Sequence, residues 1–192
     1  MTTSLRVRRS LAATARTHVR ALGLSLGAMW AGFAAVLLSG GQLLSFGVVP
    51  RTSAGALGIL VAPFLHANLD HLLANTVSFA LLGWMVMWRD PRHYWQVTIV
   101  SLLTAGGAAW LLGSPNSVHV GASGLVFGYL GFLMLSGWYA RTFAAIAISV
   151  GVTAAWGGLV FGVLPSTPGV SWPSHLGGFI GGILMARAYR RT

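Results

Sequence analysis

Residues 121–140 read GASGLVFGYLGFLMLSGWYA, a run without a charged side chain. A helix needs about 20 mainly apolar residues to cross the hydrocarbon core of a bilayer, and this run is long enough. Ser123 stands near its start, where a buried polar group costs free energy unless it is hydrogen-bonded. The run therefore predicts a membrane-spanning helix that begins with a candidate functional serine.

The composition of the whole chain is that of an integral membrane protein. Of its 192 residues, 55% are hydrophobic and 7% are charged, which excludes an ordinary soluble domain and a disordered chain. With 121–140, five further uncharged runs predict six transmembrane helices. These runs are 21–50, 71–88, 94–113, 142–164 and 170–186.

A shorter apolar segment, 52–65, lies between the first two runs. It is too short to cross a bilayer, so we expect an embedded loop. The expected fold is an all-α integral membrane protein, a six-helix bundle with an embedded first external loop. Residues 1–20 are interpreted as a basic cytoplasmic tail and residues 21–191 as the six-helix domain.

The charged residues separate the apolar runs. The formal net charge of +10 comes from twelve arginines and two acids, Asp70 and Asp90. If six spans alternate across the membrane, eleven arginines lie on one side and Arg51 alone on the other. The positive-inside rule then predicts cytoplasmic termini, and this distribution disfavours a nucleic-acid partner. A short chain without cysteine fits a bacterial plasma membrane.

Polar residues of three expected helices share one depth in the membrane. Ser123 begins the fourth span and His175 lies near the start of the sixth, both entered from the external side. His71 and Asn75 begin the second span from that side, and their i, i+4 spacing puts them on one helical face. We therefore expect these four side chains to meet.

Their chemistry suits acyl transfer. A serine hydroxyl needs a base to become a good nucleophile, and neutral histidine is suited to that task near neutral pH. The backbone N–H of Ser123, at a helix start, could join Asn75 and His71 in donating hydrogen bonds to an oxyanion. These residues predict a Ser–His dyad.

No carboxylate is expected to orient the histidine. Asp90 falls on the cytoplasmic side, and Asp70 is better placed to cap the second span. Packing must then hold the imidazole, and Phe127, one turn after Ser123, could stack on it. A glycine pair at GxxxG spacing, which lets helices approach closely, follows each dyad residue: Gly124 with Gly128 and Gly178 with Gly182.

Other interpretations of these polar residues are less specific. A membrane serine ordinarily hydrogen-bonds within its own helix. His66, His71 and His119 could bind a metal, but their spacing is not that of His-Glu-x-x-His, so no metal and no cofactor are expected. For His119 a solvated loop position is favoured, and His18 and His93 are expected to be ordinary surface residues.

The combination resembles the rhomboid family of intramembrane serine proteases, over about residues 21–191. The matching patterns are His-x4-His-x3-Asn at His66, His71 and Asn75, Gly-x-Ser-Gly at Gly121 to Gly124, and His-x2-Gly-x3-Gly at His175, Gly178 and Gly182. The chain departs from the family in two places. Pro50-Arg51-Thr52 stands where many members have Trp-Arg, and Phe127 stands where tyrosine is common.

The resemblance implies that Ser123 is the nucleophile, that His175 is the general base, and that His71, Asn75 and the Ser123 N–H form the oxyanion hole. Residues with a supporting role would be His66, Gly121, Gly124, Phe127, Gly178 and Gly182. The implied substrates are transmembrane helices of membrane proteins, admitted from the bilayer by the fifth helix (142–164) and the segment 165–172. A catalytically inactive rhomboid-like protein that binds membrane helices and a small-solute transporter are the alternatives.

Overall fold

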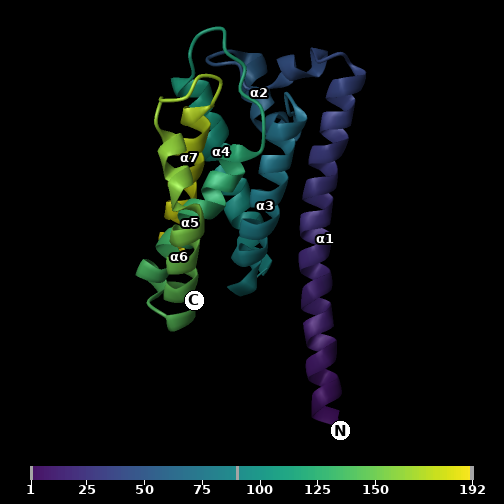
Figure 1. Cartoon of the computed structure of the whole chain (residues 1–192), viewed down its shortest axis with the longest axis vertical. Helices are drawn as coiled ribbons and strands as arrows, with labels where there is room; N and C mark the ends of the chain where they lie inside the picture. The colour runs from purple at the N-terminus through teal and green to yellow at the C-terminus, as the bar shows by residue number, and fades with distance from the viewer. Residues whose placement is uncertain (1, 90, 191–192) are drawn as a thin grey trace.

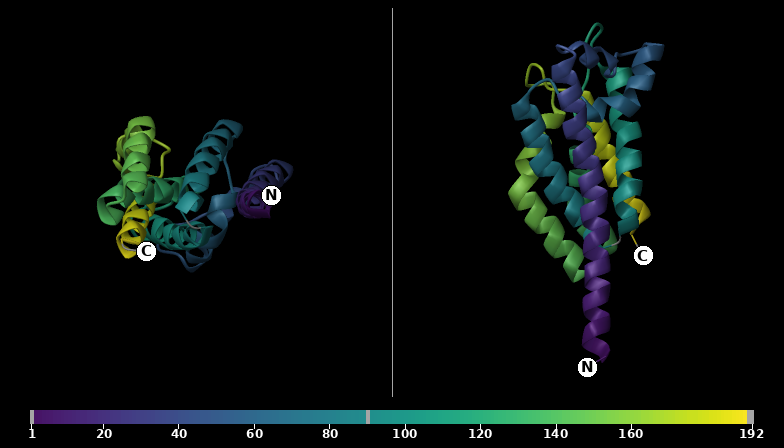
Figure 2. Two further views of the ribbon diagram at one scale, coloured as in Figure 1. Left: turned by 90° about the horizontal axis from the view of Figure 1, so that it is seen from below. Right: turned by 90° about the vertical axis from the view of Figure 1, so that its right-hand side faces the viewer.

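The first apolar run and the basic segment before it form one continuous helix. The computed structural model describes residues 2–89 and 91–190, and α1 spans Thr2–Leu38. Its first turns extend past the rest of the bundle, and α1 lies at the edge of the molecule (Figures 1 and 2). The first span therefore ends before the expected Pro50. It stops at Gly40 and Gly41, whose φ angles of 59° and 85° are left-handed.

The expected embedded loop is a chain of short helices between α1 and α3. These are η1 (Gln42–Phe46), α2 (Ser53–Val61) and η2 (Ala62–Phe64). The turn at Pro50-Arg51-Thr52 is fastened to the end of α4, because Arg51 Nη1 donates hydrogen bonds of 3.0 Å to the carbonyls of Leu111 and Gly113. The loop is thus anchored although the Trp-Arg pair is missing.

Five longer helices follow. They are α3 (Leu69–Arg89), α4 (Pro91–Leu112), α5 (Ser123–Ala140), α6 (Phe143–Trp156), which continues into η3 (Gly157–Val163), and α7 (Trp172–Ala188). The segments 14–38, 69–88, 91–112, 123–140 and 143–163 are long and apolar enough to cross a membrane. The sixth expected span, α7, has 17 residues. The chain is therefore a multi-pass membrane protein with an all-α bundle.

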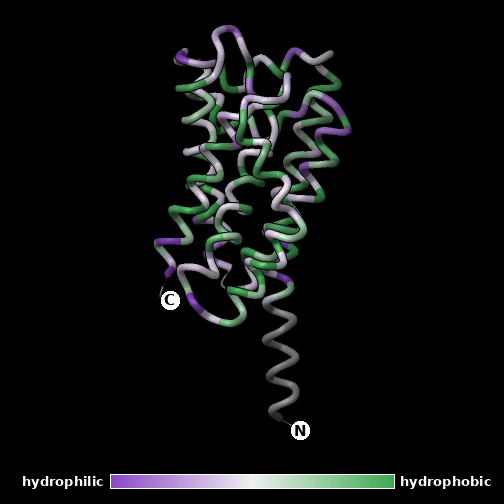
Figure 3. The backbone as a smooth tube through the Cα atoms, turned by 60° about the vertical axis from the view of Figure 1, so that its left-hand side comes forward, coloured by the Kyte–Doolittle hydropathy of each residue, from purple (hydrophilic) through white to green (hydrophobic). Residues whose placement is uncertain are grey.

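The core is built around α5. In this helix 12 of the 18 residues are buried, whereas in 143–163 only Ala145, Ser149 and Val152 are. Tyr129 of α5 packs against Phe79 and Tyr94, and its hydroxyl forms a 2.7 Å hydrogen bond with Thr98. Hydrophobic residues predominate along the helices, while hydrophilic stretches lie mainly in the connections (Figure 3). The central helix is thus the one that begins with Ser123.

The two expected glycine pairs face each other across α5 and α7. A Cβ atom on Gly178 would lie 1.9 Å from the carbonyl oxygen of Gly124, and one on Gly182 would lie 1.9 Å from that of Gly128. Side chains at these positions would collide with backbone, which cannot move aside. The seam therefore sets the distance between the helix that begins with Ser123 and the helix that carries His175.

Candidate active site

The turn before α5 requires its glycine. Gly121 has a φ of 105°, and its N–H donates a 2.8 Å hydrogen bond to the carbonyl of Ala62. A Cβ atom on Gly121 would lie 2.5 Å from Cε1 of His71. Both the left-handed backbone and the close approach exclude larger residues. This turn leads directly into Ser123, the first residue of α5.

Ser123 and His175 form a hydrogen bond. The distance between Ser123 Oγ and His175 Nε2 is 2.8 Å, and His175 lies in the first turn of α7. On the other side of the ring, Nδ1 lies 3.0 Å from the carbonyl oxygen of Gly162 in η3. A carbonyl only accepts, so Nδ1 carries the proton of the neutral ring. Nε2 is then free to accept the hydrogen of the serine hydroxyl.

The plane of the imidazole is fixed by stacking, as expected. The ring centroids of Phe127 and His175 are 4.1 Å apart and the planes differ by 8°. A Cβ atom on Gly162 would lie 2.9 Å from Phe127 Cζ and 3.3 Å from His175 Nδ1. The orienting group is thus a backbone carbonyl. No sequence pattern could identify it, because every residue has such a carbonyl.

His71 and Asn75 approach the same place from α3. The His71 ring lies against Gly121, and Asn75 is 5% exposed. Among the described residues, the buried Nδ2 atom of Asn75 has no hydrogen-bond partner. A buried donor without an acceptor is costly unless a ligand or a reaction intermediate supplies one. The four polar residues expected to meet therefore lie together.

The cap of α3 differs from the expected one. The side chain of Asn68 accepts a 2.8 Å hydrogen bond from the N–H of His71. Asp70 lies inside the first turn of the helix and is not the capping residue, so that prediction is wrong. An asparagine just before the helix suits an N-cap because its side-chain oxygen can reach the N–H groups of the first turn.

His66, three residues before the start of α3, packs against the His71 ring. Its side chain is fully buried and meets the His71 ring edge to face, with centroids 5.2 Å apart. Burial, followed by the neighbouring His71, lowers the pKa of His66 to about 4. His66 is therefore neutral near pH 7. Among the described residues no three histidine or acidic side chains form a group that could hold a metal ion.

His119 is not a solvated loop residue, contrary to expectation. It is half-buried; its Nδ1 lies 2.7 Å from Ser171 Oγ and its Nε2 lies 3.0 Å from Ser117 Oγ. Burial lowers the pKa of His119. The backbone of the loop pairs with Val48 and thereby turns the ring inward.

The expectation that His18 and His93 are surface residues is also wrong. Their side chains are buried, with exposed fractions of 5% and 6%. His18 packs edge to face on Trp84, and His93 packs against Tyr189. Both rings pack against aromatic side chains from other parts of the chain, and the sequence alone does not indicate which helices are neighbours.

A cavity of about 710 Å³ opens at the candidate site. Its lining includes Ser123, His175, His71 and Asn75, together with Leu159 of η3. The two flanking elements, α3 and η3, also carry exposed apolar side chains. The site is thus open to a ligand between two peripheral elements.

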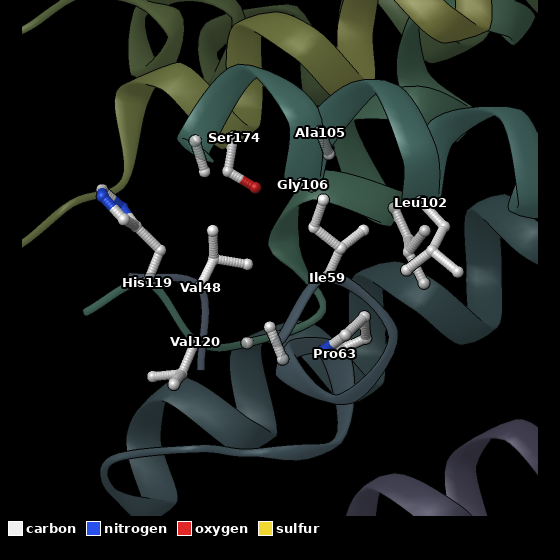
Figure 4. Close-up of a pocket in the computed structure, with 14 residues that line it drawn as sticks. Val48, Ile59, Pro63, Leu102, Ala105, Gly106, His119, Val120 and Ser174 are labelled. Carbon is white, nitrogen blue, oxygen red and sulfur yellow. The ribbon is translucent and has the colours of Figure 1, made fainter. Parts of the chain in front are cut away.

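A second cavity lies behind the serine turn. It has a volume of about 20 Å³, enough for one water molecule, and is lined by Ile59, Ala105 and Ser174 among others (Figure 4). The ring of His119 lies at its edge and points toward the segment that leads into α7. His119 therefore lies between the small cavity and the large one.

Several known proteins are similar to this chain over much of its length. An uncharacterized protein of Mycobacterium tuberculosis is 37% identical over 158 residues, which are 78% of this chain and 65% of that protein. A putative rhomboid protein of Acanthamoeba polyphaga mimivirus is 29% identical over 143 residues, 70% of this chain and 75% of that protein. A rhomboid-like protease of Toxoplasma gondii is 32% identical over 138 residues, 67% and 16% of the two chains.

The chain spans about two thirds of the length of the mycobacterial relative, at 65%. The family model of the Rhomboid domain matches residues 53–192, which include every one of the candidate site residues. The match extends over more than half of the chain and includes α3 to α7, among them α3, α5 and α7, which line the cavity. The chain therefore belongs to the rhomboid family.

Proposed function

We propose that this protein is an intramembrane serine endopeptidase that hydrolyses peptide bonds in or near transmembrane helices of membrane proteins. The observation that carries the proposal is the 2.8 Å contact between Ser123 Oγ and His175 Nε2, with Nδ1 of the same ring held 3.0 Å from the Gly162 carbonyl. This arrangement gives the histidine the tautomer that a general base needs. The name of the Toxoplasma gondii relative, a rhomboid-like protease, adds support.

In the proposed reaction, Ser123 Oγ attacks the carbonyl carbon of the scissile bond while Nε2 of His175 takes the hydroxyl proton. The imidazolium then gives this proton to the leaving amine, and an acyl-enzyme remains. A water molecule, deprotonated by the same nitrogen, then attacks the acyl carbonyl, and the imidazolium returns that proton to Ser123 Oγ as the ester bond breaks and the carboxylic acid product leaves. The Gly162 carbonyl accepts the Nδ1–H throughout and stabilises the ring when it is charged.

The oxyanion of the tetrahedral intermediate requires donors. The N–H of Ser123, the first residue of α5, is one such donor. The first N–H groups of a helix have no intrahelical acceptor, and they form the positive end of the helix dipole. The unpartnered Nδ2 of Asn75 is a second, and the His71 ring against Gly121 is a third. Donors aimed in advance at the developing charge lower the barrier without reorganisation.

The position of the cavity favours a substrate that arrives through the bilayer. Its walls include α3 and η3, which expose the apolar side chains of Leu73, Val77 and Phe161. A transmembrane helix can approach such apolar surfaces without leaving lipid. On the distribution of its arginines, we propose that both termini lie in the cytoplasm. The absence of cysteine and the mycobacterial relative support a bacterial plasma membrane as the host. No metal or organic cofactor takes part in the proposed reaction.

The test is turnover of a transmembrane substrate in liposomes by Ser123→Ala and His175→Ala variants. Each change should lower kcat by at least about 10³-fold, because each removes one member of a dyad that acts as a unit. Ser136→Ala is the matched control, since Ser136 lies on α5 and bonds the carbonyl of Phe132 in its own helix. Undiminished turnover in either dyad variant would contradict the mechanism.

A fluorophosphonate probe separates the protease from an inactive family member. Labelling that disappears in Ser123→Ala is expected for the protease, whereas an inactive helix-binding protein would remain unlabelled. Substrate uptake by the reconstituted protein that is insensitive to Ser123→Ala would indicate a transporter instead.

A further inference from the structure

A second serine–histidine hydrogen bond joins the two segments that carry Ser123 and His175. Nδ1 of His119 lies 2.7 Å from Oγ of Ser171. His119 precedes Ser123 by four residues, and Ser171 precedes His175 by four residues. Both contacts therefore link the same two segments. In one the first segment supplies the histidine and the second the serine, and in the other the first supplies the serine and the second the histidine.

Ser171 is directly coupled to the first turn of α7. It stands at the N-cap position of the helix, and its carbonyl accepts a 3.1 Å hydrogen bond from the N–H of His175. A displacement of Ser171 is thereby passed to His175 through the backbone. The side chain of Ser171 is hydrogen-bonded to His119, which belongs to the loop before α5.

His119 is a fixed point for that contact. Its N–H and carbonyl form two hydrogen bonds of 2.9 Å with Val48, and its Nε2 is bonded to Ser117. Gly113 leaves room for the ring, because a Cβ atom there would lie 2.4 Å from Nε2. Figure 4 shows the ring turned toward the segment that leads into α7.

The segment 165–171 has few other attachments. Its backbone hydrogen bonds are local: Ser166 donates to Leu164, Val170 to Thr167, and Val170 accepts from Trp172. Apart from these local bonds and the one from His175 N–H to the Ser171 carbonyl, the contact with His119 is the one hydrogen bond in the described parts of the chain that ties this segment to a part of the chain distant in sequence. Its loss would leave the approach to α7 attached only through its ends.

We infer that His119 is a positioning residue, which acts through Ser171 to hold the first turn of α7 where His175 can accept the proton of Ser123. This inference rests on the proposed function. A displacement of about 1 Å at a reacting group can cost on the order of 100-fold in rate, so a hydrogen bond that restricts the turn has a measurable effect on kcat. His119 and Ser171 also line the large cavity, so a direct role of either side chain in substrate binding would appear as a rise in KM instead of a fall in kcat.

The experiment measures kcat and KM of the full chain in liposomes for His119→Ala, Ser171→Ala and the double variant. Each single change should lower kcat about tenfold and leave KM within about twofold. The double variant should be no slower than the slower single variant, because both changes break one contact. His119→Asn, whose amide can reach the position of Nδ1, should recover most of kcat.

Ser117→Ala is the matched control. It removes the hydrogen bond of the other ring nitrogen while the contact with Ser171 remains, so kcat should stay within about twofold of the wild-type value. The inference is overturned if Ser171→Ala retains full kcat, if the effects of the two single changes multiply in the double variant, or if Ser117→Ala is as slow as Ser171→Ala.

Thermal unfolding gives a readout that does not depend on turnover, and it is measured for the wild-type protein, His119→Ala, Ser171→Ala and the double variant. Non-additive shifts of the unfolding temperature in the His119 and Ser171 variants are expected from a direct contact, and additive shifts would overturn the link between the two residues. If the wild-type protein shows no turnover, or turnover that does not depend on Ser123, the proposed function is overturned. The unfolding data then still test the contact between His119 and Ser171. If His119→Ala fails to fold, the small change Ser171→Ala still decides the kcat test.

Discussion

Asn75 has a buried amide nitrogen without a hydrogen-bond partner among the described residues. If it serves the oxyanion, its contribution arises during the reaction and not in the resting protein. We therefore expect Asn75→Ala to lower kcat about 10²- to 10³-fold without lowering the unfolding temperature. The measurement is kcat with thermal unfolding in detergent. Asn68→Ala, which removes the N-cap of α3, is expected to lower the unfolding temperature instead.

A parallel loss of stability in Asn75→Ala would mean that the residue is structural and would contradict its proposed role. Spacing identified the four polar residues that the structure brings together at one cavity, Ser123, His175, His71 and Asn75. The orienting carbonyl of Gly162 and the inward position of His119 could not be predicted. They depend on how loops far apart in the sequence meet, and short-range patterns carry no signal for such contacts.

At the scale of helices, the seam between α5 and α7 is the constraint that brings the dyad together. Gly178→Ala would place a Cβ atom 1.9 Å from the Gly124 carbonyl, so the two helices must separate. We expect a loss of about 1–3 kcal/mol in unfolding free energy, as for other overpacked interiors, and a fall in kcat. Unfolding in mixed micelles measures the first and substrate turnover the second.

Gly151→Ala is the control for this seam. Gly151 lies in α6, and a Cβ atom there would meet nothing within 4 Å. The substitution should leave stability unchanged or raise it slightly, because alanine favours a helix. Equal destabilisation by the two changes would show that the seam has no special role. The seam itself was predictable, since GxxxG spacing states which helical faces are small.

The lengths of the elements were less predictable than their existence. Absence of charge identified the apolar runs, but α1 continues through the arginine-rich segment before them because arginine is a good helix former. Likewise, the fifth run divides into α6 and η3 at Gly157 and Gly158. Hydropathy indicates whether a segment is compatible with the apolar interior of a membrane. It does not indicate the residue at which helical hydrogen bonding ends.

For the molecule as a whole, stability should depend on pH through its buried histidines. The pKa of His66 is about 4 in the folded chain and 6.5 in an exposed histidine. The unfolded chain then binds more protons in this window, so stability that is complete above pH 6.5 is lost as the pH falls toward 4. His66→Phe should flatten this decline in thermal unfolding between pH 4 and 8. His119, whose pKa burial also lowers, leaves a residual slope.

Curves of identical slope for the wild-type protein and His66→Phe would contradict this assignment. The measurement needs a detergent whose own charge does not change over the pH range. Since the variant keeps an aromatic ring beside His71, a general loss of packing is not expected, and a uniform drop at all pH values would identify one if it occurred.

The segment that holds Gly162 is also among the least buried in the bundle. Its carbonyl orients the imidazole, and its Leu159 lines the wall of the cavity. Because one short helix carries both groups, an outward displacement of η3 that widened the entrance would also lengthen the 3.0 Å contact between the Gly162 carbonyl and Nδ1. The base then loses its fixed tautomer at the moment when lipid and solvent can reach the serine. For the protease proposed above, a wide entrance and an oriented base would then exclude each other.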